Sequence, residues 1–163
     1  MSQTDRDQLR ALIQQFHSGM LVTRTPEDTL HGRPMAIAKL EDNDDIFFAT
    51  SIESGKIGDV ESDHQVVLTL QSSAAWVSVS GPARIIQDRA KIEAYWNEAM
   101  KVWFPKGKTD PSLCLLRLRP AQAEFWDTQG TKRLRYLYEA AKAYVTGTTP
   151  EALPGQHGEV KHL

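Results

Sequence analysis

Apolar residues along the chain follow two different spacings, one typical of helices and one typical of strands. The apolar residues from Leu9 to Phe16 share one helical face. Thr4 and Asp7 resemble a capping pair before this helix, and Gly19 ends it. Similar spacing predicts further helices at residues 55–63, 89–104 and 132–145. Between these segments, β-branched and aromatic residues alternate with polar ones, which favours strands.

The strand-like segments are joined mostly by short links rich in turn residues. We assign strands to GMLVTRT, RPMAIAKLE, DIFFATS, QVVLTLQ, AAWVSVSGPARIIQ, SLCLLRLRP and QAEFWDT. HGRP is predicted to be a turn, EDNDD a hairpin loop, and Gly81-Pro82 a bulge or bend inside the longest strand. Short links favour antiparallel pairing because parallel neighbours need long crossovers. The pattern therefore predicts an α+β fold, a small antiparallel barrel with peripheral helices.

At 163 residues the chain is long enough for one domain with its own core. We expect this domain to span residues 1–146. Residues 147–163 are rich in Gly, Pro and Thr, so we expect a flexible C-terminal tail, or an arm that only a partner subunit orders. The tail histidines His157 and His162 are expected to be solvated, with metal binding as a minor alternative.

Charge, cysteine content and hydropathy argue against several classes of protein. A formal net charge of −2 gives no overall attraction to nucleic acid or anionic lipid. The chain has no apolar run of about 18 residues, and its polar start, MSQTDRDQ, lacks the apolar centre of a signal peptide. The single cysteine, Cys114, lies in the apolar stretch LCLL, where burial is expected rather than nucleophilic catalysis. We therefore expect a cytoplasmic protein without nucleic-acid or membrane partners.

The stretch FFATSIESGK places hydroxyls, a glycine and a lysine at the end of a predicted strand, a composition that suits phosphate binding. A nucleotide-hydrolysing P-loop would need a glycine five residues before Gly55 and a Ser or Thr after Lys56. The chain has Thr50 and Ile57 at these positions, and the antiparallel context also differs. The P-loop interpretation is therefore rejected.

A different kind of phosphate site remains open. Thr50, Ser51 and Ser54 can donate hydroxyl hydrogen bonds, and Lys56 adds a positive charge at the start of the predicted helix. Arg33 opens the strand across the EDNDD hairpin, and its guanidinium can hold a phosphate with two hydrogen bonds. Taken singly, each residue is better explained as a helix cap or a solvated charge. Together, their placement one hairpin apart favours a phosphate site.

Five stretches in a fixed order resemble the pyridoxamine 5′-phosphate oxidase-related FMN-binding split-barrel family: RPMAI, FFATSIESGK, QVVLTLQ, WVSVSGPARI and AEFWD. The insertion YWNEAMKVWFPKGKTDPSLCLLRLRP is similar to that of the general stress protein 26 group within this family. The resemblance covers the chain from Leu9 to Trp126. It implies a six-stranded antiparallel split β-barrel of Greek-key type. It also implies a homodimer that holds each flavin in a groove at the subunit interface.

The resemblance further implies a role for each matching residue. The FMN phosphate would be held by Arg33, Ser54 and Lys56. The isoalloxazine ring would lie along Pro34, Met35 and Ala36, whose backbone groups would bond its polar edge. Thr50 and Ser51 would contact the ring or the ribityl chain, and Gln71 would lie near the flavin from the end of its strand. Trp76 and Val77 would begin the strand that flanks the flavin. Trp126 would reach the cofactor from the partner subunit, although packing in the core is an equal alternative for this side chain.

The match ends before the C-terminal part of the family pattern. In the oxidases of the family, an Arg-Leu-His segment after the FW pair handles pyridoxamine phosphate. Here FWDTQGTKRLR offers Arg133 and Leu134, with Arg135 in place of the histidine. A vitamin-salvage oxidase is therefore not favoured. Arg133 and Arg135 are expected to form an exposed basic helix face, and binding of another anionic ligand is the alternative.

Other catalytic motifs are absent from the sequence. His17, His31 and His64 are scattered, and neither HExxH, paired cysteines nor a GxSxG elbow occurs. His31, near Arg33, is a candidate for a secondary ligand role. No catalytic side chain is therefore assigned, which agrees with a flavin protein because the cofactor itself carries out the redox chemistry.

Three functions remain open from the sequence. The first is a homodimeric FMN-binding general stress protein, an oxidoreductase that passes electrons or hydride to a small molecule. The second is a flavin-binding sensor or carrier without catalysis. The third is an empty barrel that binds other proteins. FAD or a deazaflavin in place of FMN is a variation on the first.

Overall fold

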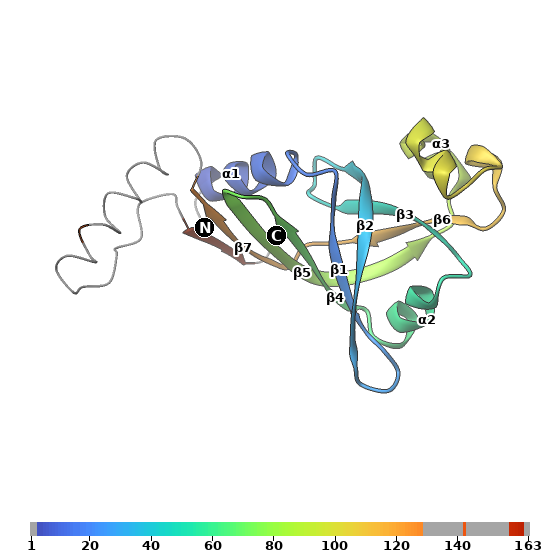
Figure 1. The fold of residues 1–163 in the computed structure, drawn as a ribbon, viewed down its shortest axis with the longest axis horizontal. Coiled ribbons are helices and arrows are strands. Elements are labelled where there is room, and N and C mark those ends of the chain that lie inside the picture. Colours follow the sequence, from blue (N-terminus) through green and yellow to red (C-terminus); the bar gives the residue numbers. More distant parts are fainter. Residues whose placement is uncertain (1–2, 129–141, 143–156, 162–163) are drawn as a thin grey trace.

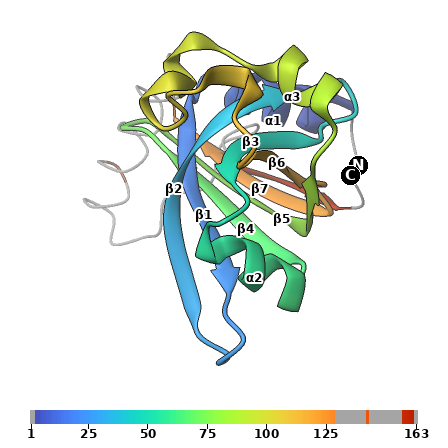
Figure 2. The ribbon, with the colours of Figure 1, turned by 90° about the vertical axis from the view of Figure 1, so that its right-hand side faces the viewer.

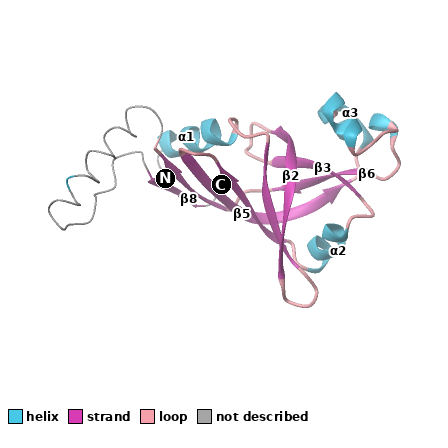
Figure 3. Cartoon of the chain, in the orientation of Figure 1, coloured by secondary structure: helices cyan, strands magenta, loops and turns pink. Residues whose placement is uncertain are grey.

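The computed structural model of the chain describes residues 3–128, 142 and 157–161. These residues form a β-barrel with helices at its periphery (Figure 1, Figure 3). The strands are β1 (Ser18–Arg24), β2 (Leu30–Leu40), β3 (Ile46–Ser51), β4 (Gln65–Gln71), β5 (Ala75–Ile86), β6 (Leu113–Leu118), β7 (Gln122–Asp127) and β8 (His157–Lys161). Within the described ranges the helices are α1 (Gln3–Ile13), α2 (Gly55–Ser62), α3 (Arg89–Tyr95) and the short 3-10 helices η1 (Glu98–Val102) and η2 (Gly107–Thr109).

The barrel is a closed ring of strands in the order β4-β1-β2-β3-β6-β5, with β5 returning to β4. The pairings between neighbours are antiparallel, as short hairpin links require. β7 continues the sheet along β5, and β8 pairs with β7. The predicted α+β fold, a six-stranded antiparallel barrel with peripheral helices, is therefore confirmed.

Strand β5 belongs to both halves of the barrel because it changes partner in its middle. Its first part pairs with β7, and its last part, from Ala83 onwards, pairs with β6. The change falls at Gly81-Pro82, where the sequence predicts a bulge or bend. At this point the β6–β7 link comes very close, and a Cβ atom on Gly81 would lie 2.0 Å from the carbonyl oxygen of Arg119. The barrel therefore depends on a residue without a side chain here.

Two apolar cores hold the fold together. The first fills the barrel with side chains from every strand of the ring, and Leu9, Leu12 and Ile13 of α1 join it. The second lies outside the barrel, beneath the insertion that follows β5. Figure 2 shows this insertion, which begins with α3, lying over the sheet near β3 and β6. It is formed by Phe47, Ile92, Met100, Phe104, Leu113 and Leu115. Because Phe47 and Phe48 point to opposite faces of β3, this strand is buried on both sides.

The insertion differs from the single helix that the sequence predicts at residues 89–104. α3 ends at Tyr95, and Trp96 has an extended backbone with ψ 137° before a short 3-10 turn begins. The break turns the chain back over the sheet. Met100 and Phe104 can then pack in the second core, and this tertiary burial outweighs the helical propensity of the segment.

Strand β2 begins earlier than predicted. Its first residue is Leu30, so the expected HGRP turn is wrong, and those residues lie inside the strand. The turn before it is formed around Asp28, which has a positive φ of 62°. Arg33 therefore sits within a paired strand, opposite Leu21 of β1, instead of at a strand start.

The last described strand, β8, lies within the segment predicted to be a loose tail. It pairs with β7, placing His157 opposite Trp126, and its Val160 is fully buried in the barrel core. β8 is not predictable from hydrophobic alternation, because HGEVK contains one large apolar residue. The predicted helix at 132–145 lies outside the described residues, except for position 142, as do residues 147–156.

Candidate functional site

The predicted lysine and two of the predicted hydroxyl groups form one hydrogen-bonded cluster at the start of α2. The Nζ of Lys56 donates hydrogen bonds to the Oγ1 of Thr50 (3.0 Å) and to the Oγ of Ser54 (2.6 Å). Ser51 has a different role, because its Oγ accepts a hydrogen bond from the backbone N–H of Glu53 and closes the turn. The end of β3 and the start of α2 thus bring the cluster together over a few residues of chain.

Lys56 is half-buried, and none of the ion pairs within the described part of the chain includes it. Burial lowers the pKa of Lys56, and the positive charge of nearby Arg33 lowers it further. Asp59 acts in the opposite direction but does not reverse the shift. An ammonium group that is partly removed from water beside another cation is stabilised by a bound anion.

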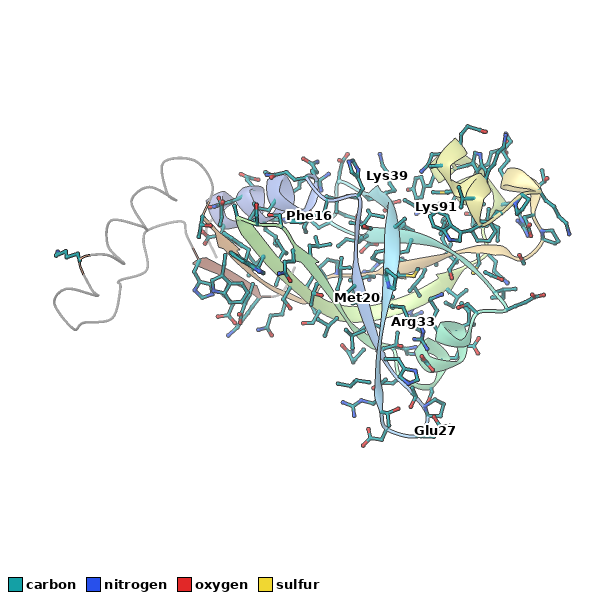
Figure 4. The ribbon with its side chains drawn as sticks, in the orientation of Figure 1. Phe16, Met20, Glu27, Arg33, Lys39 and Lys91 are labelled. Carbon is teal, nitrogen blue, oxygen red and sulfur yellow. The ribbon has the colours of Figure 1, made fainter. Side chains whose placement is uncertain are left out.

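Arg33 is held by side chains from β1, β2 and α2. Its Nη1 donates hydrogen bonds to the Oγ1 of Thr23 (2.8 Å) and to the Oδ2 of Asp59 (2.8 Å), and the second contact is an ion pair. Its Nη2 lies 3.2 Å from the Nδ1 of His31. Figure 4 shows Arg33 on the side of β2 next to α2. The guanidinium therefore sits beside the helix that carries Lys56.

Strand pairing and the packing of α2 explain this arrangement. Thr23 lies opposite His31 and Leu21 lies opposite Arg33, so Thr23 and Arg33 are diagonal neighbours on one face of the β1–β2 pair. Helix α2 packs against β1, and its buried residue Asp59 reaches that same face. One face of a hairpin and one face of a short helix thus enclose the cation.

Asp59 is buried and remains a good partner for a cation. Burial by itself raises the pKa of Asp59, but hydrogen bonds from Thr23 and Arg33 and the charge of Arg33 outweigh it, so the pKa lies below its ordinary value. Sequence reasoning missed Thr23 and Asp59. Their signals were a polar residue at an inward position of an alternating strand, and an acid next to Val60 on the apolar side of a short helix.

The other predicted flavin contacts form a separate group on the outer face of the sheet. Gln71 lies opposite Trp76, Trp76 opposite Trp126, and Trp126 opposite His157, in one row across β4, β5, β7 and β8. Both indole side chains are 39% exposed, so Trp126 is not packed in the core. The imidazole of His157 is exposed and stacks on Trp126, with ring centroids 5.1 Å apart.

The remaining predicted contacts differ in their accessibility. Pro34 and Ala36 are exposed, whereas the side chain of Met35 between them is buried in the barrel core. Val77 is buried in the same core, next to the exposed Trp76. A ligand on the outer face would therefore meet the side chains of Pro34, Ala36 and Trp76.

The single cysteine is part of the barrel wall and not of a reactive centre. Cys114 is fully buried, and its Sγ lies 3.4 Å from the carbonyl oxygen of Thr50. Burial raises the pKa of its thiol to about 11. A thiol in this state is a poor nucleophile at neutral pH, and the burial expected from the sequence is confirmed.

No helix among the described residues is both long and apolar enough to cross a lipid bilayer. No three His, Cys, Asp or Glu side chains among them lie close enough together to hold a metal ion.

The closed ring of antiparallel strands and the cationic cluster beside α2 define a split-barrel protein with a candidate phosphate site. Residues 4–151 match the family described as pyridoxamine 5′-phosphate oxidase like. The chain therefore belongs to this family, as the ordered sequence stretches predict.

Three similar proteins show how far the likeness extends. Protein bli-3 of Neurospora crassa is 32% identical over 118 residues, in a match that covers 65% of this chain and 56% of that protein, so this chain spans about half of its length. The structure of general stress protein 26 from Bacillus anthracis matches with a TM-score of 0.67 and 24% identity, over 74% of this chain and 92% of that one. The general stress FMN/FAD binding protein of Xanthomonas citri matches with a TM-score of 0.61 and 31% identity, over 70% of this chain and 82% of that one.

Proposed function

We propose that this is a cytoplasmic flavin-binding general stress protein that holds FMN by its phosphate and acts as an oxidoreductase. The observation that carries the proposal is the half-buried Lys56 without a carboxylate partner among the described residues, set beside Arg33 and the hydroxyls of Thr50 and Ser54. The relative from Xanthomonas citri, 31% identical, is named as an FMN/FAD binding protein. The flavin would supply the redox chemistry, while the chain binds and orients it.

The donor set fits a phosphate ester. A phosphate monoester carries close to two negative charges at neutral pH and offers three acceptor oxygens. The site supplies one ammonium, one guanidinium and two hydroxyls for them. Ser54 occupies the N-cap position of α2, but its side chain makes no capping hydrogen bond. The N–H of Ile57 donates to the carbonyl of Ser54 (2.9 Å), whereas no hydrogen bond among the described residues uses the N–H of Gly55 or Lys56, and these two can meet an anion.

The purified protein is expected to carry FMN or to take it up with higher affinity than riboflavin. Visible absorption and mass spectrometry of the released small molecule identify the cofactor, and FAD serves as a comparison. A preparation that neither contains nor binds any flavin would overturn the proposal. Reduction of the bound flavin by NADH or NADPH would mark an oxidoreductase, whereas a bound flavin that resists both would favour a carrier or sensor.

We also propose that the protein is a homodimer whose interface covers the outer face of β1, β4, β5 and β7. Met20 is 44% exposed on this face, and Trp76 and Trp126 are each 39% exposed. Large apolar side chains gathered on one accessible sheet face support coverage by a partner. The family resemblance adds that Trp126 of one subunit reaches the flavin of the other.

Replacing Trp76 by glutamate is expected to convert the dimer to a monomer, because an unpaired carboxylate would be buried at the interface. FMN affinity should fall as well, since the site loses its contribution from the partner subunit. Light scattering coupled to gel filtration measures the mass. Val102→Glu is the matched control, because Val102 is 77% exposed on η1, away from this face. A monomeric parent protein, or a dimeric Trp76→Glu variant, would contradict the proposal.

A further inference from the structure

On its buried side, the guanidinium of Arg33 contacts two side chains that are almost inaccessible to solvent. Thr23 is 1% exposed and Asp59 is 6% exposed, whereas 28% of the Arg33 side chain is exposed. The Oδ2 of Asp59 accepts hydrogen bonds from both the Oγ1 of Thr23 (2.8 Å) and the Nη1 of Arg33 (2.8 Å). Because the Oγ1 of Thr23 also accepts a bond from Nη1, the three groups form a closed triangle.

This triangle determines which edge of the guanidinium remains available. Both N–H groups of Nη1 are taken by Thr23 and Asp59, and Nη2 is in contact with His31. Among the hydrogen bonds of the described residues, none uses the Nε–H of Arg33 or a second N–H of its Nη2. The Nε–H and one N–H of Nη2 form one edge of the guanidinium plane, and an edge with two donors can grip two oxygens of one phosphate.

We propose that Thr23 and Asp59 are positioning residues that fix the Nε–Nη2 edge of Arg33 for a phosphate held beside Lys56. This inference rests on the proposed flavin function and deepens it. Neither residue touches the ligand; they act by restricting the guanidinium to one orientation. The pair thereby makes the site prefer a flavin that carries a 5′-phosphate over one that does not.

Asp59 also brings one negative charge to a site that holds two cations. Lys56 and Arg33 are close enough for Arg33 to lower the pKa of Lys56, so two cations share a partly buried space in the unliganded protein. Asp59 offsets one of these charges from the buried side, and therefore leaves the exposed side to the phosphate. A buried ion pair adds little net stability in general, which fits a role in specificity better than one in holding α2 to β1.

The test compares two ligands that differ only by the phosphate. Dissociation constants for FMN and riboflavin are measured by quenching of flavin fluorescence, and their ratio reports the phosphate site alone. Thr23→Val is nearly isosteric and removes the bridging hydroxyl. It should reduce the preference for FMN about tenfold while leaving riboflavin affinity unchanged, because a hydrogen bond to a charged group is lost. Thr23→Ser, which keeps the hydroxyl, should retain the preference of the parent protein.

Variants at Asp59 test the second contact of the triangle, between Asp59 and Arg33. Asp59→Asn keeps an acceptor for Arg33 and should retain most of the preference for FMN, whereas Asp59→Ala should lose about tenfold, again the effect of one charge-assisted hydrogen bond. Thr25→Val is a matched control, since Thr25 is a buried threonine of the same hairpin whose hydroxyl contacts Thr29 instead of Arg33. It should change thermal stability but not the ratio.

The outcomes separate this inference from the proposed function. If the parent protein binds FMN and riboflavin equally, the phosphate site itself is wrong and the proposed function fails with it. If the parent prefers FMN and Thr23→Val keeps that preference, the function stands and the positioning role is overturned. An equal loss of both ligands in Thr23→Val also overturns it, because a purely structural role would act on both.

Discussion

Replacing Lys56 by methionine is expected to weaken FMN binding about fiftyfold, equivalent to about 2.3 kcal/mol, because a hydrogen bond to a charged group contributes roughly 1.5–3 kcal/mol. Riboflavin should bind the variant and the parent equally. The unliganded variant should be at least as stable as the parent, since the lowered pKa of Lys56 means that folding disfavours its charge. Calorimetric titration with both ligands and thermal unfolding of the free protein measure these quantities.

Lys39→Met is the matched control for this change. Lys39 lies further along the same strand as Arg33, is exposed, and is outside the cluster (Figure 4). Its replacement should alter neither FMN nor riboflavin binding. If Lys56→Met left FMN affinity unchanged, or weakened both ligands alike, the lysine would not be a phosphate ligand.

The pH dependence of binding gives an independent measure of the same charge. FMN affinity should fall as the pH rises through the lowered pKa of Lys56, starting below the ordinary lysine value of 10.5. In that window the unliganded protein gains stability with rising pH, because the unfolded chain holds the proton more tightly than the folded chain. Above about pH 7 the phosphate is already doubly ionised, so the change reports the lysine. Lys56→Arg stays charged and should abolish the fall.

The barrel strands could be predicted from the sequence because most of them alternate between the core and solvent, as QVVLTLQ does in β4. Closure of the ring could not be predicted in the same way. It depends on β5 pairing with β4 on one edge and with β7 and then β6 on the other. Alternation within a strand indicates which face of that strand is buried, but it does not indicate which other strand pairs with it. The helix break at Trp96 was missed for a related reason, since packing beneath the insertion decided it.

In the candidate site, too, the local contacts could be predicted from the sequence and the long-range ones could not. Thr50, Ser54 and Lys56 lie within seven residues of chain, so local spacing was enough to group them. Arg33 required one hairpin, which the EDNDD loop indicates. Thr23 and Asp59 are 36 residues apart and meet only because α2 packs against β1. A contact of that kind has no periodic signature, and its only traces in the sequence are a polar residue at an inward strand position and an acid on the apolar side of a short helix.

A second substitution with a large expected effect, this time on folding stability, is at Gly81, where the barrel closes. Replacing Gly81 by alanine is expected to lower the free energy of unfolding by about 3–4 kcal/mol, because overpacking against atoms that cannot move aside is strongly destabilising. The new Cβ would lie 2.0 Å from the carbonyl oxygen of Arg119 and 2.9 Å from the backbone nitrogen of Ala121. Both atoms belong to the backbone of the β6–β7 link, so no side-chain rotation can relieve the clash.

Relief of the clash would instead require the link to move away from β5. That movement would break the hydrogen bonds from the N–H of Arg119 to the carbonyl of Pro82 (3.0 Å) and from the N–H of Ala121 to that of Ser80 (2.8 Å). These bonds join β5 to β6 and β7 at the point where it changes partner. The barrel would therefore open at its junction, and Gly81→Ala should also weaken cofactor binding indirectly.

Urea unfolding followed by tryptophan fluorescence measures the loss, and Gly58→Ala provides a control of opposite sign. Gly58 is exposed within α2, and a Cβ atom there would meet nothing within 4 Å. Alanine favours a helix over glycine by about 0.5–1 kcal/mol, so Gly58→Ala should be more stable than the parent. The same chemical change would then stabilise one site and destabilise the other, which only the close approach at Gly81 explains. A Gly81→Ala variant within about 1 kcal/mol of the parent, the range of ordinary substitutions, would show that the β6–β7 link yields easily.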